Sequence, residues 1–225
     1  MKYLITLLAA ATFLSCGPNS DIMQDPSISY LALGDSYTIG ESVEEDQRWP
    51  VQLAAKLNEN GVNVRTPKII ATTGWRTDNL KDAIESTPLG KQYDLVSLLI
   101  GVNNQYQGKT VESFAPEFEE LLQTAIELAG GVKEHVFVLS IPDYGKTPFG
   151  ASKEEEIAKE LDEYNAVSKE ICQKYNVDYF DITPISREAK EKPELIARDQ
   201  LHPSGKMYER WVELIYEDIL SKARK

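Results

Sequence analysis

The sequence predicts an α/β domain built as a three-layer sandwich, with a five-stranded parallel sheet and helices on both of its faces. Short apolar runs of strand length alternate along the chain with longer stretches in which apolar residues recur at helical spacing. The short runs are apolar almost throughout, which is typical of parallel strands buried on both faces. The 225 residues, of which 42% are hydrophobic and 27% charged, are enough for one domain with a full core.

Five segments have the length and the apolar character of strands. They are 28–33, 62–71, 93–100, 135–141 and 177–182. The run 93–100 (YDLVSLLI) is the most strand-like of them and stops at Gly101. Pro67 weakens the prediction for the second segment, because proline has no N–H group to donate to a sheet.

Five stretches with helical spacing separate or follow these strands. They are 49–60, 77–86, 111–128, 152–175 and 204–223. Pro50 in the first turn and Gly61 just beyond the end favour the first of these helices. The Glu-rich run 153–156 is interpreted as the solvated start of the fourth helix. The polar segment 183–200 predicts a long surface loop before the last helix, and loops of that length are often functional.

Charge and missing motifs exclude several classes of function. The formal net charge of -12 and the pI near 4.7 argue against nucleic acid as a partner, because such proteins need clustered Lys and Arg. The same charge makes a polyanionic polymer a less natural substrate. The sequence has no His-Glu-x-x-His, no phosphate-binding Gly-rich loop and no Cys-x-x-Cys, so it implies no metal and no cofactor. It also lacks Gly-x-Ser-x-Gly, the nucleophile elbow of the α/β-hydrolases.

Residues 1–15 are predicted to be a signal peptide. Lys2 precedes an apolar run at 4–14 that is too short to span a bilayer, and Ser15-Cys16-Gly17 follows. The ending Phe-Leu-Ser-Cys resembles the lipobox of bacterial lipoproteins, in which the cysteine becomes the lipidated first residue, although Phe13 stands where Leu is commonest. This resemblance implies a lipid anchor on Cys16. The polar residues that follow, with turn formers at both ends, predict a linker at 16–26 before a folded domain at 27–225.

The expected localisation is therefore that of an exported lipoprotein, periplasmic or at the cell surface, which contacts the membrane only through its lipid. Secretion as a soluble protein is the alternative. A disulfide between Cys16 and Cys172 is the alternative to lipidation of Cys16. Cys172 lies in the predicted helix 152–175, where it is expected to be a small buried apolar residue.

A hydroxyl group at the end of the first strand is the first candidate for catalysis. Gly34 allows the backbone to turn sharply there, and Asp35 and Ser36 follow. Because ligands of open α/β sheets bind at the carboxyl ends of the strands, Ser36 stands where such folds carry out chemistry. The alternative is an ordinary turn in which Asp35 or Ser36 caps a helix.

Only two histidines are present, which narrows the choice of a catalytic base. His135 directly precedes a strand, at the opposite edge of the sheet, and is interpreted as a structural or solvated residue. His202 follows Asp199 by three residues, so the two side chains lie on the same side of a turn. The carboxylate can then bind one imidazole nitrogen and leave the other to accept a proton. A helix-entry turn with both side chains solvated is the alternative.

Two further strand ends carry candidate donors for an oxyanion hole. Gly74 lies just past the second strand, and Asn103 follows the third in Gly101-Val102-Asn103. At one edge of a parallel sheet, the Gly74 N–H group and the Asn103 amide can point to the place where negative charge develops in acyl transfer. Each residue taken alone is also a common turn residue. It is harder to explain all of these residues as ordinary turn residues, because they occur in order at the ends of successive strands.

Across essentially the whole mature chain, the sequence resembles the SGNH (GDSL-type) hydrolases. The four motif blocks of that family occur in order as Gly34-Asp35-Ser36, Gly74, Gly101-Val102-Asn103 and Asp199-x-x-His202. The resemblance implies that Ser36 is the nucleophile, His202 the general base and acid, and Asp199 the carboxylate that orients it. It further implies an oxyanion hole made by the N–H groups of Ser36 and Gly74 and the side chain of Asn103, and a sheet in flavodoxin-like order.

Two positions depart from the pattern of that family. Tyr37 stands where the family name has Leu, and Asn104 stands where the family often has Asp. The catalytic groups themselves are intact. The departures therefore concern loop support or substrate preference and not the reaction.

The expected function is hydrolysis of carboxylic esters through a Ser-His-Asp acyl-enzyme mechanism, with a small-molecule or glycan ester as the substrate. Residues beside the catalytic strand ends are predicted to line the substrate cleft, namely Tyr37, Trp75, Arg76, Tyr106 and the loop 143–149 with Tyr144. No long apolar insertion forms a lid, which favours short acyl groups such as acetyl esters on glycans. A lysophospholipase or thioesterase activity is one alternative, and a lipid-anchored binding module without catalysis is another.

Overall fold

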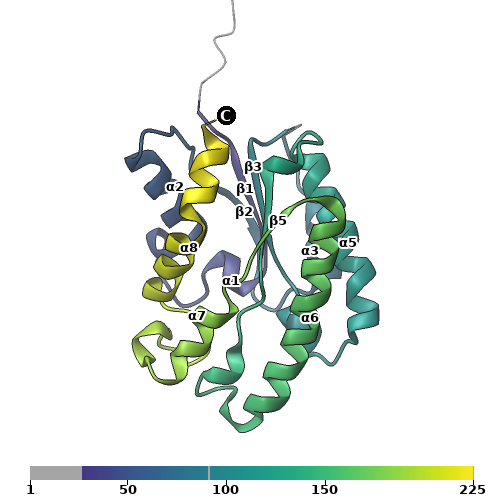
Figure 1. The fold of residues 1–225 in the computed structure, drawn as a ribbon, viewed down its shortest axis with the longest axis vertical. Helices are drawn as coiled ribbons and strands as arrows, with labels where there is room; N and C mark the ends of the chain where they lie inside the picture. Colours follow the sequence, from purple (N-terminus) through teal and green to yellow (C-terminus); the bar gives the residue numbers. More distant parts are fainter. Residues whose placement is uncertain (1–26, 91, 225) are drawn as a thin grey trace, which may run out of the picture.

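The central sheet, which lies between the helices in Figure 1, has the strand order β2-β1-β3-β4-β5, and every neighbouring pair of strands is parallel. It is seen in a computed structural model that describes residues 27–90 and 92–224. The strands are β1 (Tyr30–Gly34), β2 (Lys68–Ala71), β3 (Leu95–Leu99), β4 (Val136–Leu139) and β5 (Asp178–Phe180). This is the flavodoxin-like order, and it confirms the predicted fold class.

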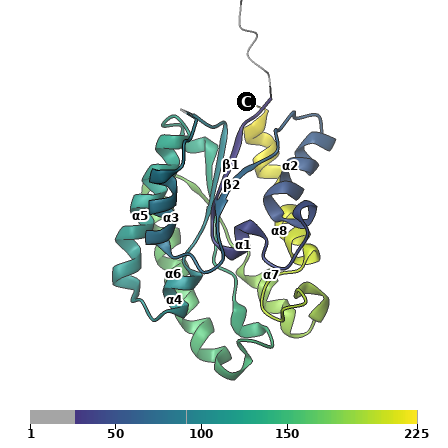
Figure 2. The ribbon, with the colours of Figure 1, turned by 180° about the vertical axis from the view of Figure 1, so that it is seen from behind.

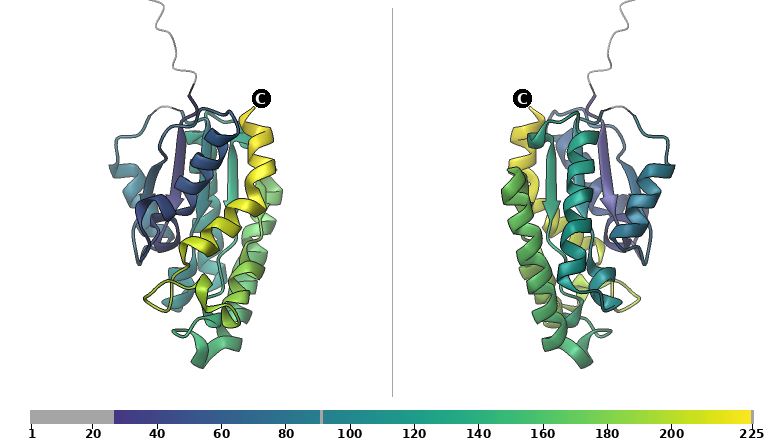
Figure 3. Two further views of the ribbon diagram at one scale, coloured as in Figure 1. Left: turned by 90° about the vertical axis from the view of Figure 1, so that its left-hand side faces the viewer. Right: turned by 90° about the vertical axis from the view of Figure 1, so that its right-hand side faces the viewer.

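Helices cover both faces of the sheet, as the two side views in Figure 3 show. One layer consists of α2 (Trp49–Glu59) and α8 (Gly205–Ala223), which pack against each other. The opposite layer consists of α3 (Thr77–Ser86), α5 (Val111–Leu128) and α6 (Glu154–Tyr175). Short 3₁₀ turns lie between the larger elements and are η1 (Glu45–Gln47), η2 (Lys133–His135), η3 (Tyr144–Lys146), η4 (Ala151–Lys153), η5 (Glu188–Lys190) and η6 (Pro193–Leu195).

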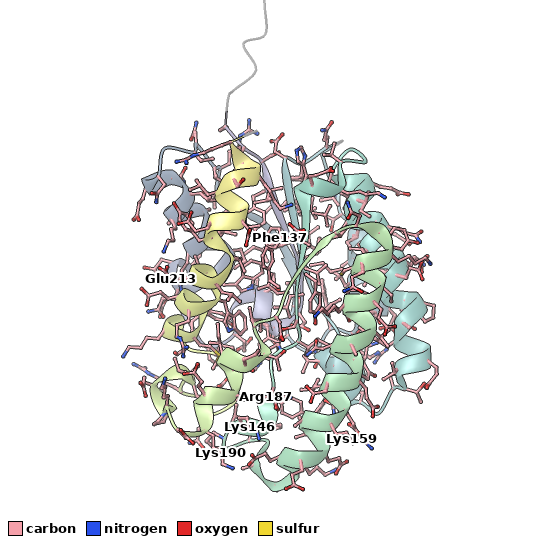
Figure 4. All side chains as sticks on the ribbon, viewed as in Figure 1. Phe137, Lys146, Lys159, Arg187, Lys190 and Glu213 are labelled. Carbon is pink, nitrogen blue, oxygen red and sulfur yellow. The ribbon has the colours of Figure 1, made fainter. Side chains whose placement is uncertain are left out.

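Aromatic rings join the sheet to the α2–α8 layer. Phe137 of β4 lies in the interior (Figure 4) and is fully buried. Its ring centroid lies 6.3 Å from those of Tyr30 and Trp49 and 6.1 Å from that of Phe180. Rings at this distance in edge-to-face or tilted arrangements add to the energy of burial alone. The cluster fixes α2 against three strands of the sheet.

The carboxyl ends of the strands gather at one edge, where three short helices lie (Figure 2). These are α1 (Ser36–Ile39), α4 (Val102–Tyr106) and α7 (Thr183–Arg187). A Cβ atom at Gly34 would collide with Thr38 Oγ1 and with the backbone oxygen of Leu99. Glycine therefore allows α1 to fold back closely over the end of the β1–β3 pair, and the sharp turn brings Ser36 to this edge.

The predicted elements are confirmed, with differences at their ends. The helices 77–86 and 111–128 have the predicted bounds, and the other three differ by one or two residues. The strands are shorter than predicted, above all the second, which begins only after Pro67. Before that proline, Val64 makes an isolated bridge to Ile28 and not a continuous ladder.

The prediction of a long loop at 183–200 is wrong. The segment contains α7, η5 and η6, and it packs against α8. Its few apolar residues are the reason, because Ala189 and Leu195 are buried in the main core. The polar composition of the segment reflects its solvated side, while these buried side chains, together with ion pairs such as Arg187–Asp143 and Glu188–Arg210, hold it against the domain.

Cys172 lies in α6 and is fully buried, as predicted. Burial raises the pKa of its thiol to about 12. The predicted signal peptide, linker and lipid anchor on Cys16 fall on residues outside the described part of the chain. Within residues 27–90 and 92–224, no helix has both the length and the apolar character needed to cross a bilayer.

Candidate active site

Ser36 opens helix α1 directly after the end of β1. Asp35 caps the helix, since its Oδ1 accepts a hydrogen bond of 3.0 Å from the Tyr37 N–H group. Ser36 is the first helical residue, and the N–H group at this position has no partner within a helix. The residue is buried, with 4% of its surface exposed. Ser36 thus presents a hydroxyl and a backbone donor at the same edge of the sheet.

Asp199 and His202 form a hydrogen-bonded pair, as their spacing predicts. His202 Nδ1 lies 2.6 Å from Asp199 Oδ2, and Asp199 Oδ1 accepts from the N–H groups of Leu201 and His202 at 3.0 Å each. Partial burial disfavours the Asp199 carboxylate, but hydrogen bonds from Ser42, His202 and Leu201 outweigh it and lower the pKa of Asp199 to about 2. An ionised carboxylate only accepts, so Nδ1 carries the proton and Nε2 remains free to accept one.

Ser36 and His202 line one cleft with a volume of about 160 Å³. The Tyr37 ring, which also lines it, packs edge-on against His202 at a centroid distance of 5.8 Å and against Trp211 at 6.4 Å. These contacts hold the imidazole in place from the side of the core. No hydrogen bond joins Ser36 Oγ to the His202 ring among the described residues. In catalytic pairs this bond commonly tightens only in the complex with substrate.

The two residues predicted to complete an oxyanion hole line the same cleft. Gly74 has a φ of +86° in a turn that is closed by a 3.2 Å hydrogen bond from the Trp75 N–H group to Thr72 O. This backbone conformation favours glycine. Asn103 Nδ2 donates to Trp75 O at 2.9 Å, which uses one of its two N–H bonds and leaves the other available. The donors of Ser36, Gly74 and Asn103 therefore border one space.

Three aromatic rings form the mouth of the cleft. They belong to Tyr106, Tyr144 and Phe149, and their centroids lie 6.1–6.3 Å apart. Tyr144 is buried, and its hydroxyl donates to Gln105 Oε1 at 3.0 Å. Tyr106 and Phe149 are 58% and 50% exposed. The Phe149 N–H group donates to Gln200 O at 3.2 Å, which ties the mouth to the loop that carries His202.

The cleft lining differs from the predicted one at several positions. Tyr37, Tyr106 and Tyr144 line it, and Phe149 comes from the predicted loop. Thr73, Val102 and Leu201 also line the cleft but were not predicted, although each directly precedes a predicted site residue. Their position in the sequence next to predicted site residues was the signal that could have predicted them.

Trp75 and Arg76, which were predicted to line the cleft, do not. The Arg76 guanidinium bridges Asp78 Oδ2 and Gln107 Oε1, both at 2.5 Å, and is held away from the cleft by this pair of acceptors. Trp75 packs against the hydrophobic core. Both side chains stabilise the loop that carries Gly74.

Asp35, next to Ser36, is fully buried. Its Oδ2 atom has no hydrogen-bond partner among the described residues. Burial raises the pKa of Asp35 to about 7. The hydrogen bond from the Tyr37 N–H group lowers this pKa but does not outweigh the burial. The carboxyl group beside the candidate nucleophile is therefore much more easily protonated than an exposed one.

His135 is remote from the cleft, as predicted. It ends η2 directly before β4, at the amino end of the strands. In the described part of the chain, no group of three or more His, Cys, Asp or Glu side chains is placed to hold a metal ion.

The geometry is suited to acyl transfer to a serine. A buried hydroxyl and an imidazole oriented by an ionised carboxylate face one cleft, as nucleophilic catalysis requires. Amide and backbone donors border the same cleft, as stabilisation of an oxyanion requires.

Comparison with solved structures finds the same fold at low sequence identity. A lipolytic protein of the G-D-S-L family from Veillonella parvula matches with a TM-score of 0.66 and 19% identity, over 85% of this chain and 97% of that one. The esterase EstA from Pseudoalteromonas sp., solved with monoethylphosphonate as inhibitor, matches with a TM-score of 0.63 and 15% identity, over 88% and 100% of the two chains. An acetyl xylan esterase from Geobacillus stearothermophilus matches with a TM-score of 0.64 and 17% identity, over 85% and 94%.

Comparison with curated proteins gives no match. Comparison with protein families matches residues 32–210 to the GDSL-like Lipase/Acylhydrolase family. This range contains Gly34-Asp35-Ser36 at one end and Asp199 and His202 near the other. The chain belongs to the GDSL-like lipase/acylhydrolase family, has the SGNH hydrolase fold and is an ester hydrolase.

Proposed function

We propose that the enzyme hydrolyses esters of short acyl groups through a covalent intermediate on Ser36. His202 Nε2 takes the hydroxyl proton while Ser36 Oγ attacks the ester carbonyl carbon, and Asp199 stabilises the imidazolium that forms. The imidazolium then gives this proton to the oxygen of the leaving alcohol. In the second half, water loses a proton to His202 and attacks the acyl group, and Ser36 Oγ recovers a proton as the carboxylic acid leaves.

The tetrahedral intermediates carry a negative oxygen that needs preorganised donors. The N–H groups of Ser36 and Gly74 and the free N–H bond of the Asn103 amide supply them in this proposal. Because the charge exists only in the transition state and the intermediate, these donors raise kcat more than they improve substrate binding.

The small volume of the cleft is the observation that supports the proposal of a short acyl group. Its volume of about 160 Å³ is close to that of a cavity which holds one benzene molecule, roughly 150 Å³. An acetyl group together with the first atoms of the alcohol fits this space, whereas a long acyl chain would have to extend beyond it, past Tyr106 and Phe149. The exposed rings of Tyr106 and Phe149 offer flat apolar surfaces beside it, which suit a sugar ring of the leaving group. Acetylated carbohydrates are therefore the favoured substrates, and one similar structure is that of an acetyl xylan esterase.

A second candidate is an acylhydrolase for longer chains, such as a lysophospholipase or thioesterase. The same two rings favour it, because Tyr106 and Phe149 leave an apolar path out of the cleft. p-Nitrophenyl esters of increasing chain length, acetylated xylan, a lysophospholipid and an acyl-CoA separate the two candidates. We expect kcat/KM to be highest for acetate and to fall from butyrate onward. A rise towards octanoate, or preference for the lysophospholipid or acyl-CoA, would establish the second candidate.

The nucleophile is tested separately from the substrate. Wild-type protein should show a burst of p-nitrophenol from p-nitrophenyl acetate and label with a fluorophosphonate probe, and Ser36→Ala should do neither. Ser221→Ala, at an exposed position of α8, is the matched control and should behave as wild type. Equal labelling of Ser36→Ala and wild type would refute the assignment of Ser36.

The proposal includes an anchor on Cys16 and export of the protein. The described chain enters β1 at Tyr30, at the amino ends of the strands, so in this proposal an anchor on Cys16 joins the domain at the edge of the sheet opposite the cleft. In a bacterial host, full-length wild type should partition into the detergent phase on phase separation, and Cys16→Ser should not. Wild type in the aqueous phase would instead support soluble secretion.

A further inference from the structure

A buried polar cluster joins the loop of Gly74 to the helix of Asn103. Its centre is Asn104, which is fully buried. Asn104 Oδ1 accepts from the Thr77 N–H group at 3.1 Å, and Asn104 Nδ2 donates to Thr77 Oγ1 at 2.6 Å and to Glu117 Oε2 at 3.4 Å. The Thr77 hydroxyl in turn donates to Glu117 Oε2. We refer to Asn104, Thr77 and Glu117 as the Asn104 cluster.

The hydrogen bonds of the cluster suit an amide at position 104. An amide accepts through its oxygen and donates through its nitrogen, and Asn104 does both. A carboxylate there would accept from Thr77 but would donate to nothing. It would also face the carboxylate of Glu117 across one hydroxyl, and two such groups in a partly buried site repel each other. The neutral, hydrogen-donating amide of Asn104 thus complements the carboxylate of Glu117 in this chain.

The cluster spans the strand that carries the nucleophile. Thr77 begins α3, which follows β2, whereas Asn104 lies in α4, which follows β3. In the sheet, β1 runs between these two strands and ends next to Ser36. The Gly74 loop and α4 therefore have to meet across the end of β1 to bring their donors to one oxygen.

Two more hydrogen bonds join the same two segments. Asn103 Nδ2 donates to Trp75 O at 2.9 Å, and Arg76 Nη1 donates to Gln107 Oε1 at 2.5 Å. Both lie nearer the surface, and Gln107 is exposed. The Asn104 cluster is the buried part of the connection, where a hydrogen bond contributes most to a fixed geometry.

We propose that Asn104 is a positioning residue for the oxyanion hole, which it sets by fixing the distance between the Gly74 N–H group and the Asn103 amide. The inference rests on the oxyanion hole of the proposed function. Asn104 does not line the cleft and acts through its neighbours Asn103 and Thr77. Since oxyanion donors act in the transition state, a shift of the donors lowers kcat and leaves KM nearly unchanged.

The first test is Asn104→Asp, which keeps the size of the side chain and removes its two donated hydrogen bonds. We expect kcat for p-nitrophenyl acetate to fall about tenfold or more, with KM within about twofold of wild type, since loss of a whole oxyanion donor costs a hundred- to a thousandfold. Asn60→Asp adds the same charge at an exposed end of α2 and is the matched control, with unchanged kcat.

The second test is rescue. In Asn104→Asp combined with Glu117→Gln, the new amide supplies the donor that position 104 has lost and removes the second carboxylate. We expect this double variant to recover most of the wild-type kcat. A role confined to stability would change the melting temperature in these variants and leave kcat, measured well below melting, unaltered.

The third test asks whether Asn104 acts through Asn103. If it does, Asn104→Asp lowers kcat much less in an Asn103→Ala background than in wild type, because the two changes damage the same element. Should Asn104→Asp not fold, Thr77→Val takes its place, since it removes the hydroxyl from the cluster at nearly constant shape and retains the Thr77 N–H bond. A severalfold fall in kcat at unchanged KM is expected for it.

The outcomes separate this inference from the proposed function. The positioning role alone is overturned if Asn103→Ala is impaired while folded Asn104→Asp retains the wild-type kcat. The same holds for folded Thr77→Val where that variant replaces Asn104→Asp. Wild-type kcat in Asn103→Ala overturns the oxyanion hole itself, and with it both proposals.

Discussion

Ser42 Oγ donates a hydrogen bond of 2.7 Å to Asp199 Oδ2, the same carboxylate oxygen that lies 2.6 Å from His202 Nδ1. Ser42 follows α1, the helix that begins with Ser36, so this bond links the loop after the nucleophile to the loop of the base. Ser42 has a φ of +67°, a conformation that non-glycine residues rarely adopt. Ser42 thus binds the carboxylate of Asp199 from a strained backbone position.

Ser42→Ala should lower kcat by roughly threefold to tenfold, because the carboxylate loses one of the bonds that fix its orientation towards His202. KM for p-nitrophenyl acetate should stay close to wild type. Alanine retains the backbone strain, so Ser42→Gly serves as the control that also lacks the hydroxyl but relaxes the strain. Equal kcat in wild type and both variants would show that the bond does not contribute to catalysis.

Asp199→Asn should make the free energy of unfolding depend less steeply on pH in the acid range. The pKa of Asp199 in the folded protein is lowered to about 2 from its ordinary value of 3.8, so the ionised form stabilises the fold. This contribution is complete above about pH 4 and is lost as the pH falls towards about 2. The free energy of unfolding of wild type should therefore drop more steeply over this range than that of Asp199→Asn. Parallel curves in urea titrations would contradict the prediction, and Asp46→Asn at an exposed site is the control.

Asp35→Asn should stabilise the protein relative to wild type, and this gain should grow as the pH rises. The folded-state pKa of Asp35 is raised to about 7, so the fold prefers the protonated form and loses stability as the pH rises from about 4 to about 7. Each unit of this shift corresponds to about 1.4 kcal/mol. Asparagine is neutral at every pH and still accepts from the Tyr37 N–H group. Relative to wild type, the melting temperature of Asp35→Asn should rise between about pH 4 and about pH 7. A difference that is constant with pH would refute the prediction.

Arg187→Met should destabilise the wall of the cleft. Arg187, which is labelled in Figure 4, donates from Nε to Asp143 Oδ2 at 2.9 Å. The Asp143 side chain is fully buried, whereas that of Arg187 is 33% exposed. Removing one partner of a buried pair typically costs about 3–5 kcal/mol, and the exposure of Arg187 reduces the expected loss to about 2 kcal/mol. Asp143 also caps η3 through the Gly145 N–H group, so Tyr144 should shift and KM should rise. Urea unfolding and steady-state kinetics measure both effects, with Lys192→Met as the exposed control. An unchanged free energy of unfolding would count against the pair.

The fold was predictable because its signals are local. An apolar run such as 93–100 is long enough for a strand and too short for a helix, and glycines mark where the strands end. Ser36, Gly74, Asn103 and His202 could be placed at one edge because all strands of a parallel sheet end on the same side. Pairing of His202 with Asp199 needed only a spacing of three residues.

The lining of the cleft was harder to predict, because it depends on contacts between distant segments. Arg76 stands next to the Gly74 loop in sequence, yet Asp78 and Gln107 hold its guanidinium elsewhere. Phe149 reaches the cleft because its backbone binds Gln200, a residue of another loop.

The amino-acid sequence alone determined the α/β class, the order of the motif blocks and the identity of the candidate catalytic groups, since these follow from periodicity and from residue type at strand ends. The tertiary structure alone decided that Tyr106 and Phe149 meet at the mouth of the cleft, that Asn104 is paired with Glu117, and that the segment 183–200 folds against α8. The physical reason is that burial and hydrogen bonding between distant segments exist only once the chain has folded, and no local pattern encodes them.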